Sequence, residues 1–545
     1  MISVSKQQWQ LAAFVTLAVF LVYGQAIGNS YVDWDDFKLI VHNPILQHLN
    51  LKSIWLAFTT YDPELYIPLS LLTYHVDRII GGGEFHAAVT IFINLLFHTG
   101  VSLAVMWVAT QLTRNKWIGI VVGLIFALHP QNTEAAVWAS ARKDLVSSLF
   151  FFLSWGYYLQ SEKKKSILMF LLSLLSKVST LMLPLVLILS DWLHERPINK
   201  ASLKEKIPYF LLSIAFGIIA MLGKPGSGGL FLEKILIGAR SVWLYIGHVF
   251  WPTKFALLYP FTESISFHNP QLLWSLIGVV VVTVVVFLLA MGNRLFAWAW
   301  MTFGILVAPS FQNFTKGENY YLDVYVGSDR YAYLATVPII IVAVVIIAKA
   351  ISSSRIRNAV AAVIVITLGY LAHNQSLMWK DTGTLFVNVL QWYPNSHLAQ
   401  TNVGIILDKK GHTDLAIERF KESLRIRPNE HAYFNLGQYE RARGNLEEAK
   451  RLYIEALKIN PVHALSKINL APILLGEGKP EEALKILDQA EYLEPDDPVL
   501  LFNKATTLET LGRRDEAIEY YNMVLEVNPS DKETKMKLEE LLLGK

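Results

Sequence analysis

The stretch "AYFNLGQYERARGNLEEAKRLYIEALKINP", from Ala432 to Pro461, decides the fold of the C-terminal part of the chain. Its features return every 33 or 34 residues. Prolines stand at Pro394, Pro428, Pro461, Pro495 and Pro529, and glycines at Gly411, Gly444, Gly478 and Gly512. Each of these glycines is followed five residues later by an alanine. A period of this length indicates a stack of repeated two-helix units.

The small residues explain how such units pack. In the first helix of each unit they are Gly404, Gly437, Ala471 and Ala505, and in the second Ala416, Ala449, Ala483 and Ala517. A period of 34 residues with two helices per unit is the tetratricopeptide pattern, in which the proline closes the second helix. We predict four repeats, at 397–429, 430–463, 464–497 and 498–531. A polar capping helix is expected at 532–545, because the end of a solenoid needs a polar face.

Solenoids of this kind bind peptides or protein surfaces in a concave groove. The first helices carry an asparagine at the same position in every unit: Asn402, Asn435, Asn469 and Asn503. These amides are candidates for contacts to a bound protein. The alternative is that they serve packing or local hydrogen bonds.

The composition upstream of the repeats is different. Only 17% of the 545 residues are charged, against about 25% in soluble proteins, and the deficit falls between residues 9 and 373, a series of apolar runs. The net charge of +3 and the lack of a basic patch argue against a nucleic-acid partner. The chain has no cysteine, which excludes disulfides, thiolate nucleophiles and Cys-based zinc sites.

The apolar runs predict a polytopic helical membrane domain over residues 1–373, followed by a linker at 374–396. Eleven runs could cross the bilayer: 9–28, 86–110, 117–135, 145–160, 166–190, 207–223, 235–252, 271–291, 295–311, 331–349 and 358–373. The first is long enough, at about 20 residues, to span a bilayer rather than be a cleaved signal peptide, the alternative.

Positive charge sets the expected orientation. One set of alternate loops is short and basic, and carries Lys6, Arg114, Lys116, Lys163, Lys164, Lys165, Lys224, Lys234, Arg294, Arg355 and Arg357. These loops are expected in the cytoplasm. The loop 29–85, the loop 312–330 and the region after 373 are then extracytoplasmic.

Two features resist this count. The basic segment 191–206 falls outside, and Lys177 lies within an apolar run, where a central charge costs about 3 kcal/mol. The alternative is that 166–190 forms two short segments with Lys177 at the outer face.

Three polar clusters lie at the outer membrane boundary. Asp33, Asp35 and Asp36 follow the first apolar run, where a carboxylate could deprotonate an acceptor hydroxyl. The alternative is that these acids are simply solvated and have no fixed partner. The second cluster contains His129, Glu134, Arg142, Lys143 and Asp144. Its two cations, Arg142 and Lys143, could bind a phosphate together with Lys177. The alternative is that the cluster is a simple short loop. In the third, Asp329 and Arg330 open a helix and form a candidate anion site or a structural ion pair.

Taken in order, these motifs resemble the transmembrane and tetratricopeptide repeat (TMTC-like) family of GT-C polyprenyl-phosphate-sugar glycosyltransferases. The matching blocks are "DWDDFKLIVHNP" (Asp35, Asp36), "YIPLSLLTY" (Tyr66), "FHAAVTIFINLLFH" (His86, Asn94, His98), "ALHPQNTEAAVWASARKDL" (His129, Glu134, Arg142, Asp144), "LLSKVSTLMLP" (Lys177) and "SDRYAYLATV" (Asp329, Arg330, Tyr333). The chain departs from the family's pattern at Ile67, where arginine is usual, and at Ala141, Val178 and Asp329. These departures suggest a bacterial branch.

The resemblance implies an inverting glycosyltransferase of the bacterial inner membrane. It would transfer mannose or a similar hexose from a polyprenyl-phosphate donor to a hydroxyl, as on Ser or Thr of a protein held by the repeats, on the periplasmic side. The expected catalytic residues are Asp35 (the base), Asp36 and Glu134; the donor-phosphate residues are Arg142, Lys177 and Arg330; the substrate-binding residues are His129, Tyr66, Asp144 and Tyr333. We predict no metal or other cofactor, although the many acids would allow a divalent ion.

Three rival functions follow from the same features. A membrane-anchored repeat scaffold for an envelope complex would need no catalytic carboxylate. A transporter or flippase would carry polar residues to the midplane from both sides. A glycosyltransferase could also act on a glycan or lipid instead of a protein.

Overall fold

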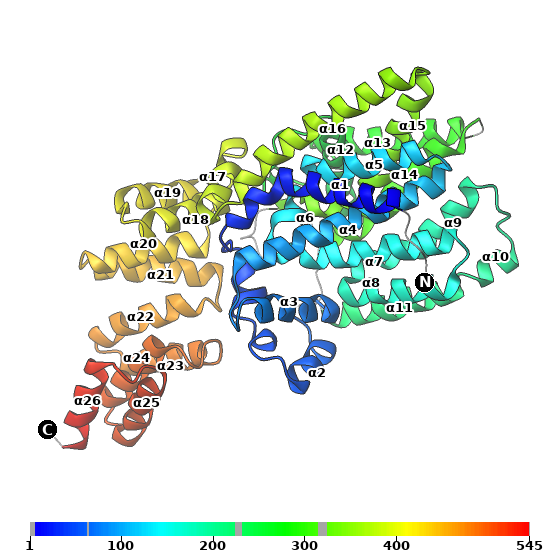
Figure 1. Cartoon of the computed structure of the whole chain (residues 1–545). Helices are drawn as coiled ribbons and strands as arrows, with labels where there is room; N and C mark the ends of the chain where they lie inside the picture. Colours follow the sequence, from blue (N-terminus) through cyan, green and yellow to red (C-terminus); the bar gives the residue numbers. More distant parts are fainter. Residues whose placement is uncertain (1–5, 63–64, 224–230, 291, 314–323, 544–545) are drawn as a thin grey trace. The chain divides into compact units, whose positions relative to one another are not determined.

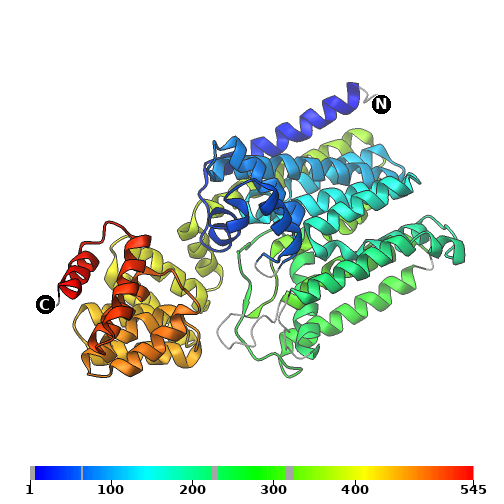
Figure 2. The same cartoon turned by 90° about the horizontal axis from the view of Figure 1, so that it is seen from below.

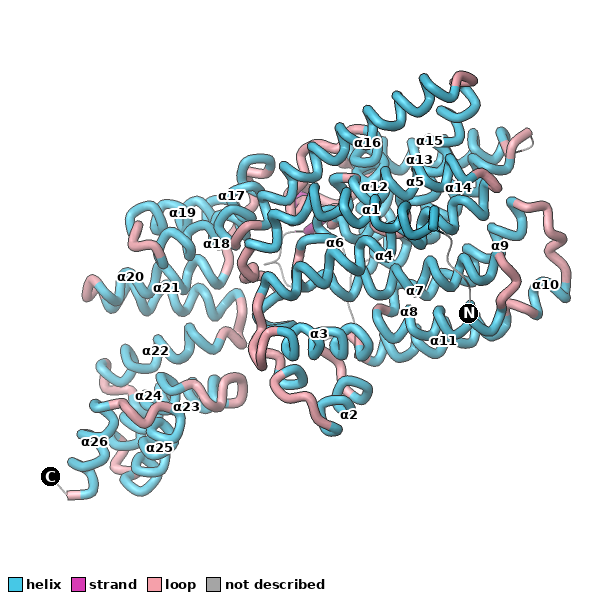
Figure 3. The backbone as a smooth tube through the Cα atoms, in the orientation of Figure 1, coloured by secondary structure: helices cyan, strands magenta, loops and turns pink. Residues whose placement is uncertain are grey.

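The computed structural model describes residues 6–62, 65–223, 231–290, 292–313 and 324–543. Most of them are helical, as Figures 1 and 3 show, so the predicted all-α class is confirmed. The only strands in these ranges are β1 (Pro260–Phe261) and β2 (Val324–Tyr325), an antiparallel pair. The chain divides into two units, one ending at Tyr393 and the other beginning at Pro394.

The first unit is a bundle of helices with short connections, and its long helices run side by side (Figures 1 and 2). The helices are α1 (Lys6–Tyr23), α2 (Leu51–Thr59), α3 (Pro68–Ile80), α4 (Ala87–Thr113), α5 (Lys116–Leu128), α6 (Thr133–Val137), α7 (Arg142–Leu159), α8 (Lys163–Ser176), α9 (Leu183–Leu193), α10 (Lys200–Lys204), α11 (Ile207–Leu222), α12 (Phe231–Phe250), α13 (Pro270–Leu289), α14 (Arg294–Val307), α15 (Thr336–Ala350), α16 (Ser354–Ser376) and α17 (Thr382–Trp392). The last of these lies within the segment predicted as a linker.

Five helical segments of the described chain are long and apolar enough to cross a membrane: Lys6–Gly28, Ala87–Thr113, Pro270–Leu289, Arg294–Phe311 and Ser354–Trp379. Others are apolar but shorter, so the total of eleven spans stays a prediction. The run 166–190 is not one helix. Helix α8 ends at Ser176, Lys177 has an extended backbone, and α9 begins at Leu183, as the alternative with two short segments predicted.

Tight packing holds the bundle together. A Cβ atom at Gly123 of α5 would lie 2.7 Å from the Cβ of Met106 in α4, so only glycine permits this approach. Large aromatic side chains fill the interior, and Trp155 of α7 and Trp298 of α14 are fully buried. The stacked rings of Phe152 and Trp155 lie 6.2 Å apart. Burial of side chains of this size dominates the packing energy of a core.

Contacts between loops define one end of the bundle. His194 Nε2 lies 3.2 Å from the carbonyl oxygen of Leu112, and Lys163 forms an ion pair of 2.9 Å with Glu205. Arg294 donates to the carbonyl of Trp192 at 3.0 Å. The segment 191–206 thus lies beside the basic loops that precede α5, α8 and α14. The orientation count put this segment on the opposite side, and that placement is wrong because the count treated 166–190 as a single span.

A buried ion pair stabilises the same end. Lys206 is fully buried, and its Nζ lies 2.5 Å from Oδ2 of Asp191. The hydroxyl of Tyr158 donates to the same oxygen at 2.8 Å. Each of the two buried charges therefore has an oppositely charged partner, as buried charges require.

The second unit is the predicted solenoid. Its helix pairs are α18 (His397–Lys409) with α19 (Thr413–Ile426), α20 (Glu430–Ala442) with α21 (Leu446–Ile459), α22 (Ala464–Gly476) with α23 (Pro480–Glu491), and α24 (Pro498–Thr510) with α25 (Arg514–Val527), followed by α26 (Lys532–Leu542). The turn glycines have φ angles from 72° to 80°, a conformation that favours glycine. At Gly437 a Cβ atom would lie 2.6 Å from the Tyr453 ring, so its small size lets the two helices of that repeat meet.

The repeated asparagines make local hydrogen bonds. Asn402, Asn435 and Asn469 each donate to the carbonyl four residues earlier in their own helix, at 2.7–2.9 Å. Asn503 donates instead to the Ile468 carbonyl of the preceding repeat at 3.0 Å. These contacts are those of the local alternative, and the use of the amides in a binding groove stays a prediction.

Candidate active site

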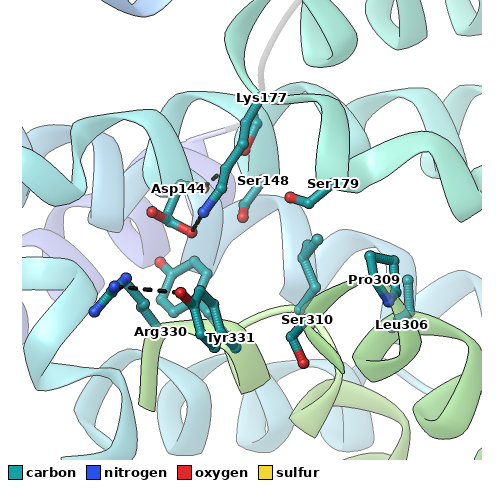
Figure 4. A pocket seen from close by; sticks show the side chains of 12 residues that line it. Asp144, Ser148, Lys177, Ser179, Leu306, Pro309, Ser310, Arg330 and Tyr331 are labelled. Atoms are coloured by element: carbon teal, nitrogen blue, oxygen red, sulfur yellow. Dashed lines mark hydrogen bonds and ion pairs between the residues drawn. The ribbon is translucent and has the colours of Figure 1, made fainter. Parts of the chain in front are cut away.

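One pocket of the first unit gathers polar side chains from four separate parts of the chain (Figure 4). The start of α7, the break after α8, the end of α14 and the segment before α15 all contribute. Its lining residues are Asp144, Ser147, Ser148, Lys177, Ser179, Leu306, Pro309, Ser310, Arg330, Tyr331, Tyr333 and Leu334. Four predicted site residues, Asp144, Lys177, Arg330 and Tyr333, are thereby brought together although 189 positions separate the first from the last.

Lys177 and Asp144 form an ion pair at this pocket. The Lys177 Nζ lies 2.5 Å from Asp144 Oδ1, and Figure 4 shows the lysine side chain pointing at the carboxylate. The break between α8 and α9 gives Lys177 its position. The other oxygen, Asp144 Oδ2, is buried and has no hydrogen-bond partner among the described residues. A buried carboxylate oxygen without a donor is unusual, and a ligand could supply one.

Arg330 is held on several sides. Its Nη1 pairs with Glu134 Oε1, and its backbone N–H donates to Glu134 Oε2 at 3.1 Å. The guanidinium lies 4.8 Å from the ring centres of both Trp138 and Tyr331. The structural ion pair considered for Arg330 thus exists, with Glu134, and the same arginine also lines the pocket.

Asp329 points elsewhere. Its carboxylate lies 3.1 Å from His248 Nδ1 and accepts from the Tyr259 hydroxyl at 2.6 Å. All three side chains are buried. This network fixes the backbone just before Arg330, so Asp329 supports the site without lining the pocket.

Hydroxyl groups complete the pocket wall. Ser147 and Ser310 donate to carbonyls of their own segments, at 3.2 and 2.7 Å. Ser148 and Ser179 make no hydrogen bond with any described residue through their hydroxyls, and in Figure 4 both lie beside Lys177. The Tyr333 hydroxyl pairs with His98 Nδ1 at 2.7 Å. The pocket therefore offers two cations, one carboxylate oxygen and two serine hydroxyls.

The two neighbouring aspartates have different surroundings. Asp36 is buried, with Oδ2 accepting from the Val32 N–H at 2.9 Å and Oδ1 accepting from Ser140. Burial raises its pKa from 3.8 to about 6, although the hydrogen bonds from Ser140 and Val32 oppose this shift. With both oxygens engaged, Asp36 ties the loop after α1 to the segment before α7.

Asp35 keeps a free carboxylate. It is partly exposed, and within the described ranges no side-chain hydrogen bond or ion pair involves it. Its charge nevertheless acts on Arg330 and on Lys143. Lys143 is buried and donates to the Ser140 carbonyl at 2.6 Å. Both oxygens of Asp35 are thus available, although Asp35 is not among the residues that line the pocket.

Arg142 does not join the pocket. Its guanidinium is fully buried and makes two hydrogen bonds of 2.9 Å with Asp77, and it also binds Asn94 and the Thr90 carbonyl. The expectation that Arg142 binds a donor phosphate therefore has no support in this geometry. A fully paired guanidinium has no donor left for a ligand.

His129 and Tyr66 also lie away from the pocket. The His129 ring lies 3.1 Å from the Val249 carbonyl through Nε2 and accepts from the Gln131 N–H at 3.2 Å. The Tyr66 hydroxyl donates to the Phe58 carbonyl at 3.2 Å. The hydrogen bonds of both side chains are to backbone groups of the chain itself. Their contacts to a substrate stay predictions.

Sequence reasoning missed the two serines with open hydroxyls. Ser148 is one of three serines in helix α7 and lies four residues after Asp144, and Ser179 follows the break at Lys177. Neither belongs to a charged cluster, so only the folded arrangement reveals them. In the described part of the chain, no group of three or more His, Asp or Glu side chains could hold a metal ion, and a reaction without metal stays a prediction.

Comparison with known proteins identifies relatives of both units. The tetratricopeptide repeat family matches residues 403–464, 440–499 and 474–541. Protein O-mannosyl-transferase TMTC1 from Homo sapiens is 29% identical over 164 residues, 28% of this chain and 18% of the relative. TMTC4 from Homo sapiens is 28% identical over 155 residues, 24% of this chain and 21% of the relative. The matches thus span about a fifth of the length of these relatives.

A longer alignment exists to protein O-mannosyl-transferase F38B6.6 from Caenorhabditis elegans, 22% identical over 452 residues, 77% of this chain and 63% of the relative. Among solved structures, the TPR protein YrrB is 19% identical and covers 29% of this chain and 82% of its own, with a TM-score of 0.26. TTC0263 from Thermus thermophilus is 25% identical and covers 33% of this chain and 95% of its own, with a TM-score of 0.23. The resemblance drawn from the motifs is confirmed: this chain is similar to the TMTC protein O-mannosyl-transferases and carries tetratricopeptide repeats.

Proposed function

We propose that this chain is an integral-membrane glycosyltransferase of the GT-C type. It transfers mannose or a similar hexose from a polyprenyl-phosphate donor to a hydroxyl group on the extracytoplasmic side of the membrane. The observation that carries this proposal is the convergence of Lys177 and Arg330 in one pocket. The names of the relatives, all protein O-mannosyl-transferases, support the same reaction.

The roles follow from the surroundings of each group. Lys177 and Arg330 bind the donor phosphate, which becomes the leaving group, since cations at that point stabilise the charge that develops on it. Asp35 takes the proton of the acceptor hydroxyl, because it alone of the aspartate pair has free oxygens. Glu134 orients Arg330 through two contacts to the same residue.

The acceptor in this proposal is a Ser or Thr of a protein held by the repeats. Such repeats bind protein surfaces, and the named relatives act on proteins by their names. A scaffold without enzymatic activity would not require two cations in one pocket. A glycan or lipid acceptor would use the same donor pocket but not the repeats.

The test is transfer from a radiolabelled polyprenyl-phosphate mannose to a Ser/Thr-rich polypeptide by the full chain in nanodiscs. Labelled polypeptide is expected with the wild type, and Arg330→Ala should abolish the label. A chain that is folded but transfers no sugar from any lipid-linked donor is a scaffold instead. Label that appears only in glycan or lipid would reassign the acceptor.

A further inference from the structure

The charges of the pocket are already balanced before any donor enters. Lys177 is paired with Asp144, and Arg330 is paired with Glu134. A phosphate that replaces Asp144 as the counter-ion of Lys177 must break the ion pair between Lys177 and Asp144. The carboxylate would then be left buried with both oxygens unsatisfied, which is costly unless new donors arrive with the ligand.

The pocket also has acceptors that lack donors. Asp144 Oδ2 is buried without a partner in the described part of the chain. Ser148, only 2% exposed, lies one helical turn further along α7 and has an open hydroxyl. Residues four positions apart share one face of a helix, so these two groups present a single polar surface. That surface fits hydroxyl groups better than it fits a phosphate, because a second anion would be repelled by Asp144.

From these contacts we propose that Asp144 is an exchangeable counter-ion that discriminates a sugar phosphate from a bare phosphate. In the unliganded pocket it neutralises Lys177. When a glycosyl phosphate enters, the phosphate takes Lys177, and Asp144 with Ser148 accepts hydrogen bonds from the sugar hydroxyls. This inference rests on the proposed function, since it assigns the sugar subsite of the same pocket.

The exchange has a consequence for the end of the reaction. After transfer, the lipid product keeps the phosphate and has lost the sugar. The hydroxyls that compensated Asp144 have left, so the carboxylate competes with the phosphate for Lys177. Asp144 therefore weakens the binding of the product and favours its release.

The experiment measures equilibrium binding to the full chain in nanodiscs. The probes are a short-chain polyprenyl monophosphate, the same lipid carrying mannosyl phosphate, and inorganic phosphate. Wild type is expected to prefer the mannosyl phosphate. Inorganic phosphate should bind much more weakly than either lipid. If inorganic phosphate and the two lipids bind with equal affinity, the pocket is a site for free phosphate and not for a lipid-linked phosphate.

Two substitutions separate the roles of the pocket groups. Asp144→Asn keeps the shape but removes the charge, so the monophosphate should bind roughly tenfold more tightly or better, since it no longer competes for Lys177. The mannosyl phosphate should gain little, and the preference for it should fall by a similar factor. Ser148→Ala should weaken only the mannosyl phosphate.

The matched control is Asp191→Asn, which removes the carboxylate from another buried lysine pair, with the same 2.5 Å distance, at the basic end of the bundle. It should leave the preference unchanged, as should the exposed substitution Asp33→Asn. The inference is overturned if Asp144→Asn keeps the wild-type preference or weakens both lipids equally. Failure of the wild type to bind any lipid phosphate would instead remove the proposed function itself.

Discussion

The carboxylate of Asp36 accepts two hydrogen bonds from Ser140, one from the backbone N–H at 3.1 Å and one from the hydroxyl at 2.5 Å. Since Val32 donates to the other oxygen, Asp36→Ala would leave buried donors without partners. We expect this substitution to lower the free energy of unfolding by about 1–3 kcal/mol. Thermal unfolding in detergent measures the loss. Ser140→Ala removes only the hydroxyl donor, so it should lower the free energy of unfolding by less than Asp36→Ala does. An equal loss of stability in both variants would argue against three donors converging on Asp36.

The pH dependence of stability tests the same carboxylate. Its pKa of about 6 in the folded protein lies above the ordinary 3.8, so between these values the folded state binds the proton more tightly. The contribution of Asp36 to stability therefore falls as the pH rises from about 4 to 6 and is level above that range. Wild type should lose stability over this range relative to Asp36→Asn. A difference between the two melting temperatures that does not change with pH would contradict the raised pKa.

The free carboxylate of Asp35 predicts a different outcome from its neighbour. Asp35→Asn should lower the rate of sugar transfer by about 10²–10⁴-fold, the range for loss of a general base. Folding and donor affinity should change little, because the side chain has no partner in the described ranges. Asp33→Asn, in the same loop, is the matched control and should transfer at the wild-type rate. Transfer that survives in the Asp35 variant would exclude it as the base.

Arg142 is expected to act on stability. Truncation to alanine leaves Asp77 as an uncompensated buried charge, which costs about 3–5 kcal/mol, and lysine cannot reproduce the paired contacts. Unfolding should therefore occur at a lower temperature in Arg142→Ala and Arg142→Lys. Lys165→Ala, which removes an exposed pair with Glu162, is the control and should be nearly neutral. If Arg142→Lys is as stable as wild type but loses donor affinity, the phosphate role returns.

The position of the segment 191–206 can be tested by labelling. The chain has no cysteine, so single substitutions report one site each. Ile198→Cys and Lys164→Cys should resist a membrane-impermeant maleimide in intact cells, whereas Lys52→Cys in the loop 29–85 should react. Labelling of Ile198→Cys together with Lys52→Cys would place the segment on the other side.

The fold followed from sequence where a period or a run of apolar residues determines it. The spaced prolines and glycines predict the helix pairs of the second unit, and the structure has a helix pair for each. The charge of Lys177 within an apolar run indicated a break in the helix. The placement of 191–206 was wrong because a missed break in 166–190 reverses the side assigned to the segment that follows it.

The candidate site was predictable only where charge marks it. Lys177 and Arg330 stood out because cations beside apolar runs are costly, and both line the pocket. Arg142 had the same signal, yet its partner Asp77 lies 65 residues away, beyond what spacing can reveal. The different surroundings of Asp35 and Asp36 depend on Ser140, which contacts only one of them. An uncharged serine such as Ser148, one of three in helix α7, is not marked by its sequence as a residue of the pocket.

The break at Lys177 also limits how far the two helices on either side of it can extend. Helix α8 has 14 residues and α9 has 11, which correspond to about 21 and 16 Å, whereas a bilayer core is about 30 Å thick. Starting from the basic end, neither helix can reach the far surface of the membrane, and tilting shortens their reach further. Under the proposed function, the pocket beside Lys177 would therefore be a recess below the lipid headgroups, which an acceptor chain would have to enter.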